Sequence, residues 1–280
     1  MATHTVRREV LGPWSLEISR EFWEGFAPAA LSGQTRDGTL TTVFRVDADW
    51  SSARSSVVQR DQVAELSVTG DGDLDAAADQ VARFLALDID ARSWPDIGER
   101  DPVIGRAQQQ LPGLRPCGFH SAYEAAAWSV LSQRVRVVEA ARMRTNIIDR
   151  YGDDGAFPAP DRLTGLDIDL PGRKTEYLAA VAEAALDGRL DTAALRAMAP
   201  DDAMQSVQEI KGIGPFAAGL IVLRGANAPD ALPPNERRLE SEVATQYGDD
   251  RSLPDVAELW RPFRTWAAVY LRALRERRGD

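Results

Sequence analysis

The stretch IKGIGPFAAGLIVLRGANAPDALPPNERRLE, Ile210 to Glu240, decides the fold. It joins a Gly-x-Gly turn to an apolar segment, a loop punctuated by proline, and an Asn-Glu pair. Gly212 and Gly214 allow backbone conformations that other residues resist. Pro215 suits the first turn of a helix, because that position needs no amide hydrogen. The pattern therefore predicts two helices joined by a tight turn, followed by a loop that leads into a third helix.

The turn is a candidate anion site. Backbone amides at the start of the second helix, those of Gly212, Gly214 and Phe216, would point outward where the helix dipole favours negative charge. Lys211 adds a positive charge beside them. Such a hairpin grips phosphate without reading bases, so it supplies affinity rather than sequence specificity. The alternative is a structural corner between two helices with no ligand.

Length and composition bound the class of protein. A chain of 280 residues, 44% hydrophobic and 27% charged, is typical of a globular protein of two domains or one large one. No apolar run approaches a membrane span and the N-terminus lacks a signal-peptide core, so we expect a cytoplasmic protein. One cysteine, Cys117, and two histidines exclude a disulfide framework, a cysteine-based zinc site and a cysteine-held iron–sulfur cluster. We expect Cys117 to be a buried apolar residue.

The net charge of −10 is unevenly distributed, because the first hundred residues alone carry −7. Downstream the arginines gather in two segments, Arg134 to Arg150 and Arg261 to Arg278. These clusters would suit a polyanion. An arginine-studded, solvated helix face explains them equally well, so charge alone does not decide the question.

The chain divides into a mixed part and a helical part. Val- and Thr-rich segments at 39–48 and 56–70, followed by a helical pattern at 73–87, predict a small antiparallel α+β domain over residues 1–100. A polar linker is expected at 88–101. Residues 101–280 are predicted to be helical, with Ser121 and Glu124 in capping-box spacing at the first long helix. The expected helices are 121–151, 174–187, 191–198, 201–209, 215–224, 236–247 and 255–277.

The hairpin together with the loop GANAPDALPPNERRL resembles the helix-hairpin-helix DNA glycosylase superfamily. Segments 101–135 and 258–273 look like the first helices and the last helix of its 3-methyladenine glycosylase II branch. This resemblance implies a mainly α fold of two helical subdomains, with the N-terminal α+β region, an antiparallel sheet domain, as an accessory domain. The hairpin would then span 203–224 and the Gly/Pro loop 225–235.

The resemblance also implies excision of a damaged base that is flipped out of double-stranded DNA. Residues that would contact the DNA backbone are Lys211, Gly212, Ile213, Gly214, Pro215 and Phe216. Gln133 and Arg134 fall on the family's wedge, with Arg where leucine is familiar. We expect a nucleoid-associated monomer without cofactor or side-chain metal site, and leave open a monovalent cation at the hairpin carbonyls.

The sequence departs from the family at the catalytic position. A bifunctional glycosylase-lyase needs a lysine where this chain has Phe216, so a monofunctional enzyme is expected. That enzyme needs a carboxylate at the end of the loop, and the alignment places Asn235 there. Three explanations stay open: Glu236 substitutes, Asn235 orients water or sugar for an already activated cationic base, or the protein binds lesions without cutting. Asn235 also fits an N-cap, with Glu236 at the first helical position.

The expected base pocket is altered too. Positions that are aromatic in the best-known alkylpurine enzymes fall on Phe216, Leu220 and Arg272. Only Phe216 keeps an aromatic face on which a base can stack. This argues against a pocket that accepts a wide range of cationic purines. Other rings that would contribute, unless they are core residues, are Trp128, Tyr123, Trp266 and Tyr270.

The function predicted from the sequence is DNA repair by a monofunctional glycosylase, with alkylated bases as substrates. A catalytically silent lesion-binding protein is the alternative. A nuclease or ligase accessory module that merely uses the hairpin is disfavoured by the extent of the resemblance.

Overall fold

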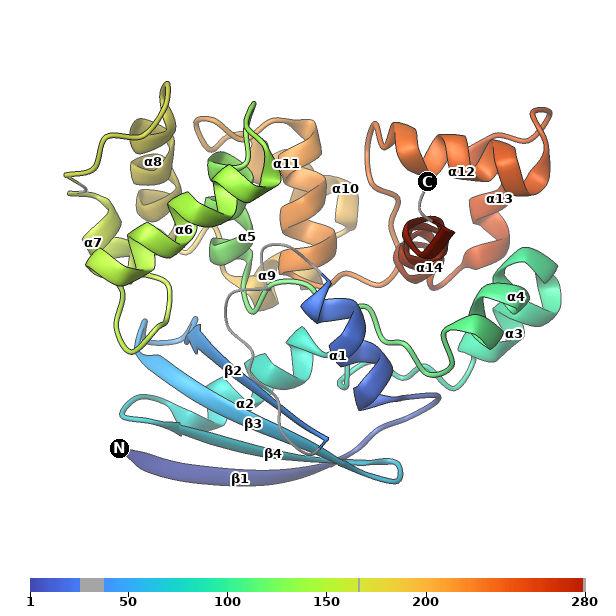
Figure 1. Ribbon diagram of the computed structural model, residues 1–280, viewed down its shortest axis with the longest axis horizontal. Coiled ribbons are helices and arrows are strands. Elements are labelled where there is room, and N and C mark those ends of the chain that lie inside the picture. The colour runs from blue at the N-terminus through green and yellow to red at the C-terminus, as the bar shows by residue number, and fades with distance from the viewer. Residues whose placement is uncertain (26–37, 166, 279–280) are drawn as a thin grey trace.

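The computed structural model describes residues 1–25, 38–165 and 167–278. Its N-terminal part is a four-stranded antiparallel sheet in the order β1-β4-β3-β2 (Figure 1). One helix, α2, packs against β1, β3 and β4. The elements are β1 (Ala2–Glu9), α1 (Leu16–Glu24), β2 (Thr39–Arg45), β3 (Ser52–Arg60), β4 (Val63–Gly70) and α2 (Leu74–Phe84).

The strands follow from the alternation of buried and more exposed side chains along the chain. In β4 the side chains of Ala64, Leu66 and Val68 are fully buried, while those between them are only half-buried. The segment 56–70, expected to be extended, is a hairpin that turns at Asp61, where φ is +52°. The edge strand β1 was not predicted, because its sequence ATHTVRRE has no buried side chain and hence no apolar pattern.

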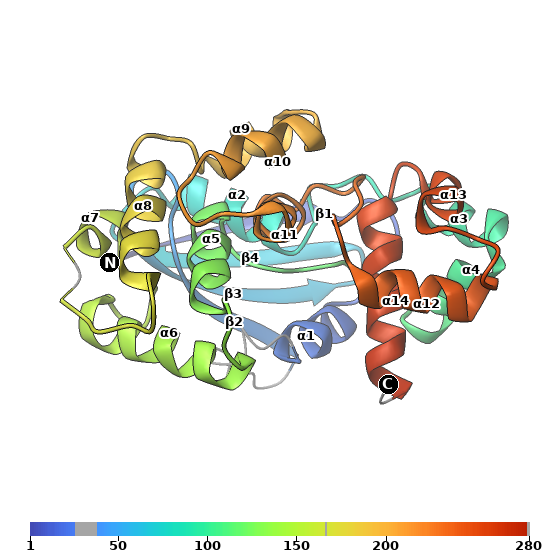
Figure 2. The same ribbon diagram turned by 90° about the horizontal axis from the view of Figure 1, so that it is seen from above.

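The rest of the chain is helical and forms two apolar cores, which confirms the predicted fold class (Figures 1 and 2). The first core is built by α5 (Ala122–Leu131), α6 (Val137–Tyr151), α7 (Pro160–Leu163), α8 (Lys174–Leu186), α9 (Thr192–Ala197), α10 (Pro200–Gln208), α11 (Pro215–Leu220) and the π-helix η1 (Ile221–Gly225). The second is built by α3 (Trp94–Arg100), α4 (Pro102–Gln110), α12 (Arg237–Tyr247), α13 (Leu253–Ala257), the 3₁₀-helix η2 (Glu258–Trp260) and α14 (Arg264–Arg278).

The predicted linker at 88–101 contains the helix α3. Trp94 of this helix is 2% exposed and lies against the rings of Trp266 and Tyr270 of α14, with centroids 5.6 and 5.0 Å away. The charged residues of the segment face solvent, which made it resemble a linker, except for Asp101, which is 1% exposed and caps α4. In its packing α3 belongs with the C-terminal helices.

The long helix expected at 121–151 is broken into α5 and α6. The chain turns at Arg134, whose φ of +55° lies in the left-handed region. Ser121 caps α5 as predicted, accepting a hydrogen bond from the Glu124 amide at 3.1 Å. The Glu124 carboxylate does not complete the capping box, because it turns inward to Arg144 Nη2 at 3.0 Å.

Two other helices are also interrupted. The segment 255–277 divides into α13, η2 and α14 around Pro262, which has no amide hydrogen to continue a helix. The segment 215–224 begins as α11 and widens into η1, where the Ala226 amide donates to the Ile221 carbonyl at 2.8 Å. Such π-turns are frequent at functional sites.

Cys117 is fully buried, as predicted, and burial raises the pKa of its thiol to about 12. The described part of the chain contains no helix with both the length and the apolar character needed to cross a bilayer.

Candidate functional site

A cavity of about 860 Å³ lies between the two helical cores. Its lining comes mainly from α1, α5, α11, η1, α14 and the loop before α12. Its lining is largely apolar, with a few charged groups among the apolar residues, the usual character of a ligand site. Residues that line it include Glu21, Phe22, Trp128, Phe216, Leu220, Arg224, Pro234, Glu236, Arg272 and Glu276.

Glu236 brings a carboxylate to this cavity. Its side chain is 14% exposed, and Oε2 accepts a hydrogen bond from Arg272 Nη1 at 2.6 Å. Oε1 accepts the backbone amide of Arg238 at 3.2 Å, so Glu236 is the N-cap of α12. The negative carboxylate at a helix N-terminus is favoured by the helix dipole.

The expectation that Asn235 caps this helix is therefore wrong. The helix begins one residue later, because Asn235 adopts φ +55°, a left-handed conformation that asparagine tolerates better than most residues. Asn235 is not among the residues that line the cavity. The turn at Asn235 directs the next side chain, that of Glu236, toward the cavity.

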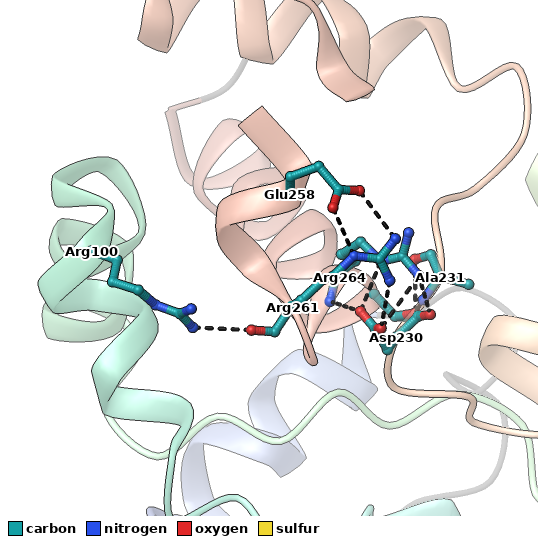
Figure 3. A network of polar contacts seen from close by, with 7 residues as sticks. Arg100, Asp230, Ala231, Glu258, Arg261 and Arg264 are labelled. Carbon is teal, nitrogen blue, oxygen red and sulfur yellow. Dashed lines mark hydrogen bonds and ion pairs between the residues drawn. The ribbon is translucent and has the colours of Figure 1, made fainter. Parts of the chain in front are cut away.

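The loop that carries Glu236 is fastened to the start of α14. Thr265 donates its amide to the Pro229 carbonyl at 3.0 Å, and its hydroxyl bonds to both the amide and the carbonyl of Ala231. Asp230 Oδ1 accepts from Arg264 Nε at 2.8 Å, and Arg261 reaches Asp230 Oδ2 at 3.3 Å (Figure 3). These contacts fix the loop five residues before Glu236.

The same loop rests directly on the hairpin helix α11. A Cβ on Gly219 would lie 2.5 Å from Cδ of Pro234, closer than two carbons can approach. Gly219 is therefore the residue that lets the loop pack against α11. This contact sets the position of Pro234, two residues before Glu236.

In the hairpin between α10 and α11 one residue is buried and most of the others are exposed. Ile213 is 6% exposed within the first core, whereas Lys211, Gly214, Pro215 and Phe216 face solvent.

The two glycines of the turn have different surroundings. Gly212 has φ +93°, and a Cβ there would overlap the ring of Tyr177. A Cβ added at Gly214 would have no other atom within 4 Å. A ligand can therefore approach the backbone at Gly214, which is the approach that the sequence predicts.

The charge of Lys211 is partly neutralised. Its Nζ is 2.5 Å from Glu176 Oε1, and Arg173 Nε is 2.6 Å from Glu176 Oε2. The hydrogen bond from Arg173, followed by that from Lys211, lowers the pKa of Glu176 to about 2. Lys211 of the hairpin thus forms a network of two cations and one anion with Arg173 and Glu176 at the start of α8.

The predicted wedge residues lie next to the hairpin. Gln133 Nε2 donates to the Gly212 carbonyl at 2.8 Å, which joins the α5–α6 turn to the hairpin. Lys174 Nζ donates to the Val130 and Gln133 carbonyls, at 2.8 and 2.7 Å, and these two hydrogen bonds hold the turn in place. Arg134 is exposed at its tip. Lys174 gave no signal in the sequence, because its partners are backbone atoms about 40 residues away.

Four of the five residues predicted for a base pocket do line the cavity, namely Trp128, Phe216, Leu220 and Arg272. Tyr123 does not. It is fully buried, its hydroxyl donates to the Pro158 carbonyl at 2.9 Å, and its ring lies against Phe157. Trp266 and Tyr270 are likewise fully buried in the second core.

Sequence reasoning missed the contribution of α1, which brings Glu21 and Phe22 to the cavity. The guanidinium of Arg224 lies 5.4 Å from the centre of the Phe22 ring, and burial lowers its pKa to about 10. Helix α1 was not predicted, so these residues had no place in the expected pocket. Among the described residues no group of His, Cys, Asp and Glu side chains is arranged to hold a metal ion.

Comparisons with known proteins agree with this geometry. No protein-family model matches the chain. It is 29% identical over 211 residues to DNA-3-methyladenine glycosylase 2 of Escherichia coli, covering 70% of this chain and 71% of that protein. It is 24% identical over 210 residues to the DNA-3-methyladenine glycosylase of Bacillus subtilis, covering 68% and 69%.

Solved structures share the fold. The 3-methyladenine DNA glycosylase of Archaeoglobus fulgidus superimposes with a TM-score of 0.73 at 19% identity, covering 95% of this chain and 96% of the other. The 8-oxoguanine glycosylase/lyase of Clostridium acetobutylicum bound to double-stranded DNA gives 0.69 at 14% identity, covering 99% of both. The chain is a DNA glycosylase of the helix-hairpin-helix superfamily. Within that superfamily it resembles the 3-methyladenine glycosylase II branch.

Proposed function

We propose that the protein is a monofunctional DNA N-glycosylase that hydrolyses the bond between deoxyribose and a damaged base flipped into the cavity. The observation that carries this proposal is the Glu236 carboxylate, which the loop delivers to an apolar cavity beside the hairpin. DNA-repair function follows from the family.

A carboxylate is the group that this reaction needs. As the glycosidic bond breaks, the sugar acquires positive charge, and a negative group held nearby stabilises it. Two unit charges about 4 Å apart interact by ~4 kcal/mol at an effective dielectric constant of ~20. That energy corresponds to about three powers of ten in rate. This figure is an upper bound for Glu236, because its ion pair with Arg272 offsets part of its charge.

The lysines support hydrolysis rather than lyase chemistry. A lyase attacks the sugar with an amine, and the chain has only two lysines, Lys174 and Lys211. Lys174 Nζ is held by two carbonyls and Lys211 Nζ by Glu176, and neither lysine lines the cavity. Phe216 presents a ring, 62% exposed, at the cavity rim.

The proposed DNA contacts surround the cavity mouth. The exposed backbone at Gly214 faces a phosphate, and Arg134 enters the base stack, where its planar guanidinium takes the place of the flipped base. Phe216 and Trp128 offer faces for the extruded base. The relatives are named DNA-3-methyladenine glycosylases, which makes alkylated bases the first class of substrate to test.

Monomeric state, action in the nucleoid and the absence of a cofactor belong to the same proposal. A monovalent cation at the hairpin carbonyls is retained as a candidate at this site. One of these carbonyls, that of Gly212, already accepts Gln133 Nε2.

The proposal is tested with duplexes that carry a single 3-methyladenine, 7-methylguanine, hypoxanthine or uracil. We expect excision of at least one lesion, seen as alkali-labile strand breaks with no break before alkali. Breaks before alkali treatment indicate lyase activity and contradict the monofunctional assignment. Binding to all four duplexes without any break supports a silent lesion-binding protein instead.

Replacing Gly214 by valine should weaken binding to every duplex alike, by about five- to tenfold, because one backbone–phosphate hydrogen bond is lost. The fold should be unaffected, since the Cβ position is open and φ is −101°. Fluorescence anisotropy with damaged and undamaged duplexes gives the affinities, and thermal unfolding provides the control. A loss confined to damaged DNA contradicts the assignment of the hairpin to the backbone.

A further inference from the structure

Arg272 lies inside the cavity and touches the carboxylate on which the proposed chemistry depends. Its Nη1 is 2.6 Å from Glu236 Oε2, and its Nη2 is 3.6 Å from Glu276 on the next turn of α14. Its side chain is 30% exposed, so it remains open to a ligand in the cavity. A guanidinium has five N–H donors, and a single hydrogen bond to Glu236 leaves others for a bound base.

A fixed positive charge changes which bases this cavity favours. Alkylation at a purine ring nitrogen such as N7 makes the base cationic in DNA, and such a base gains from an unpaired carboxylate or from aromatic faces. Here the Glu236 charge is already balanced by Arg272. A second guanidinium, that of Arg224, also lines the cavity. The other two carboxylates of the lining, those of Glu21 and Glu276, are 50% and 67% exposed, so water screens their charge. A cationic base therefore meets like charge where the carboxylate would otherwise attract it.

A neutral damaged base has the opposite requirement. When its glycosidic bond breaks, the electron pair stays on the base nitrogen, and negative charge spreads to the ring carbonyl. A guanidinium beside the base stabilises that charge by a charge-assisted hydrogen bond to the carbonyl oxygen. Water then adds to the sugar and loses a proton, and the base leaves once it is protonated.

We infer that Arg272 is a specificity-determining residue that directs this enzyme toward neutral, carbonyl-bearing damaged bases and away from cationic alkylpurines. The inference rests on the proposed function, since it assigns the substrate class of the same cavity. Arg272 contributes in two ways, by balancing Glu236 and by donating to the departing base.

The test compares two purines that share a carbonyl at position 6, neutral hypoxanthine and cationic 7-methylguanine, each in the same duplex. Single-turnover excision rates are divided by the spontaneous rate of each lesion, because the cationic base leaves more easily by itself. The variants are Arg272→Gln and, as a control for charge on the same helix, Arg275→Gln. The Arg275 side chain is half-buried, donates to the Arg238 carbonyl at 2.9 Å and lies outside the cavity lining. Thermal unfolding verifies the fold of each.

We expect the wild-type protein to raise the rate of excision over the spontaneous rate by a larger factor for hypoxanthine than for 7-methylguanine. Arg272→Gln should reduce the hypoxanthine-to-7-methylguanine ratio at least about tenfold, a change of ~1.4 kcal/mol in relative barrier. Arg275→Gln should leave the ratio within about twofold. An unchanged ratio in Arg272→Gln, with both rates lowered together, overturns the inference and leaves Arg272 as a support for Glu236 alone. Excision of 3-methyladenine or uracil, but of neither hypoxanthine nor 7-methylguanine, overturns the inference and leaves the proposed function standing. No excision of any of the four lesions overturns both.

Discussion

Replacing Glu236 by glutamine is expected to lower the single-turnover rate of excision by about two to three powers of ten. Glutamine keeps the shape of the side chain and its role at the N-terminus of α12, but it removes the charge that faces the cavity. Affinity for the damaged duplex should change little, because the proposed backbone contacts lie on the hairpin and not on this loop. Rapid-quench kinetics with enzyme in excess separates the two effects.

Two variants control this experiment. Asn235→Gly keeps the positive φ at that position and removes only the amide side chain, so its rate should stay within about threefold. Glu276→Gln removes another carboxylate from the same cavity and should also have a small effect, since that side chain is 67% exposed. A large loss of excision rate in Asn235→Gly, together with a normal rate in Glu236→Gln, contradicts our assignment and makes Asn235 the catalytic residue.

Replacing Gly219 by alanine is expected to lower the excision rate by about ten- to hundredfold, because displacement of a reacting group by about 1 Å has effects of this size. In a helix this substitution usually stabilises by ~1 kcal/mol. Here the new methyl group would lie 2.5 Å from Pro234 Cδ and would push the loop, and with it Glu236, away from α11. The readout is the single-turnover rate, compared with the affinity for the damaged duplex.

A second substitution separates displacement of the loop from general damage to the fold. In Gly219→Ala with Pro234→Ala, the proline ring that meets the new methyl group is gone, so part of the lost rate should return. Gly214→Ala, with open space at its Cβ, should leave the rate close to that of the wild type. Equal rates in the single and double variants show that Pro234 is not the residue displaced.

Much of the site could be predicted because it lies in one continuous segment. The hairpin and its loop depend on local signals, namely two glycines, Pro215 and the proline pair before Asn235. Buried aromatic residues were harder to assign. Tyr123 and Trp128 occupy one apolar helix and look equivalent in the sequence, yet only Trp128 lines the cavity. Which face of α5 meets the cavity is decided by how the two helical cores pack.

The sequence by itself determined the helical hairpin, the mixed N-terminal domain and the family to which the chain belongs, since local backbone preferences and residue periodicity carry that information. It also supplied an Asn-Glu pair without saying which of the two residues would act. The tertiary structure decided that point: the left-handed turn at Asn235 and the contact between Gly219 and Pro234 place Glu236 at the cavity. The pairing of Glu236 with Arg272, 36 residues away, likewise depends on α14 packing beside the loop. Contacts between residues so far apart in the chain arise only when the cores assemble.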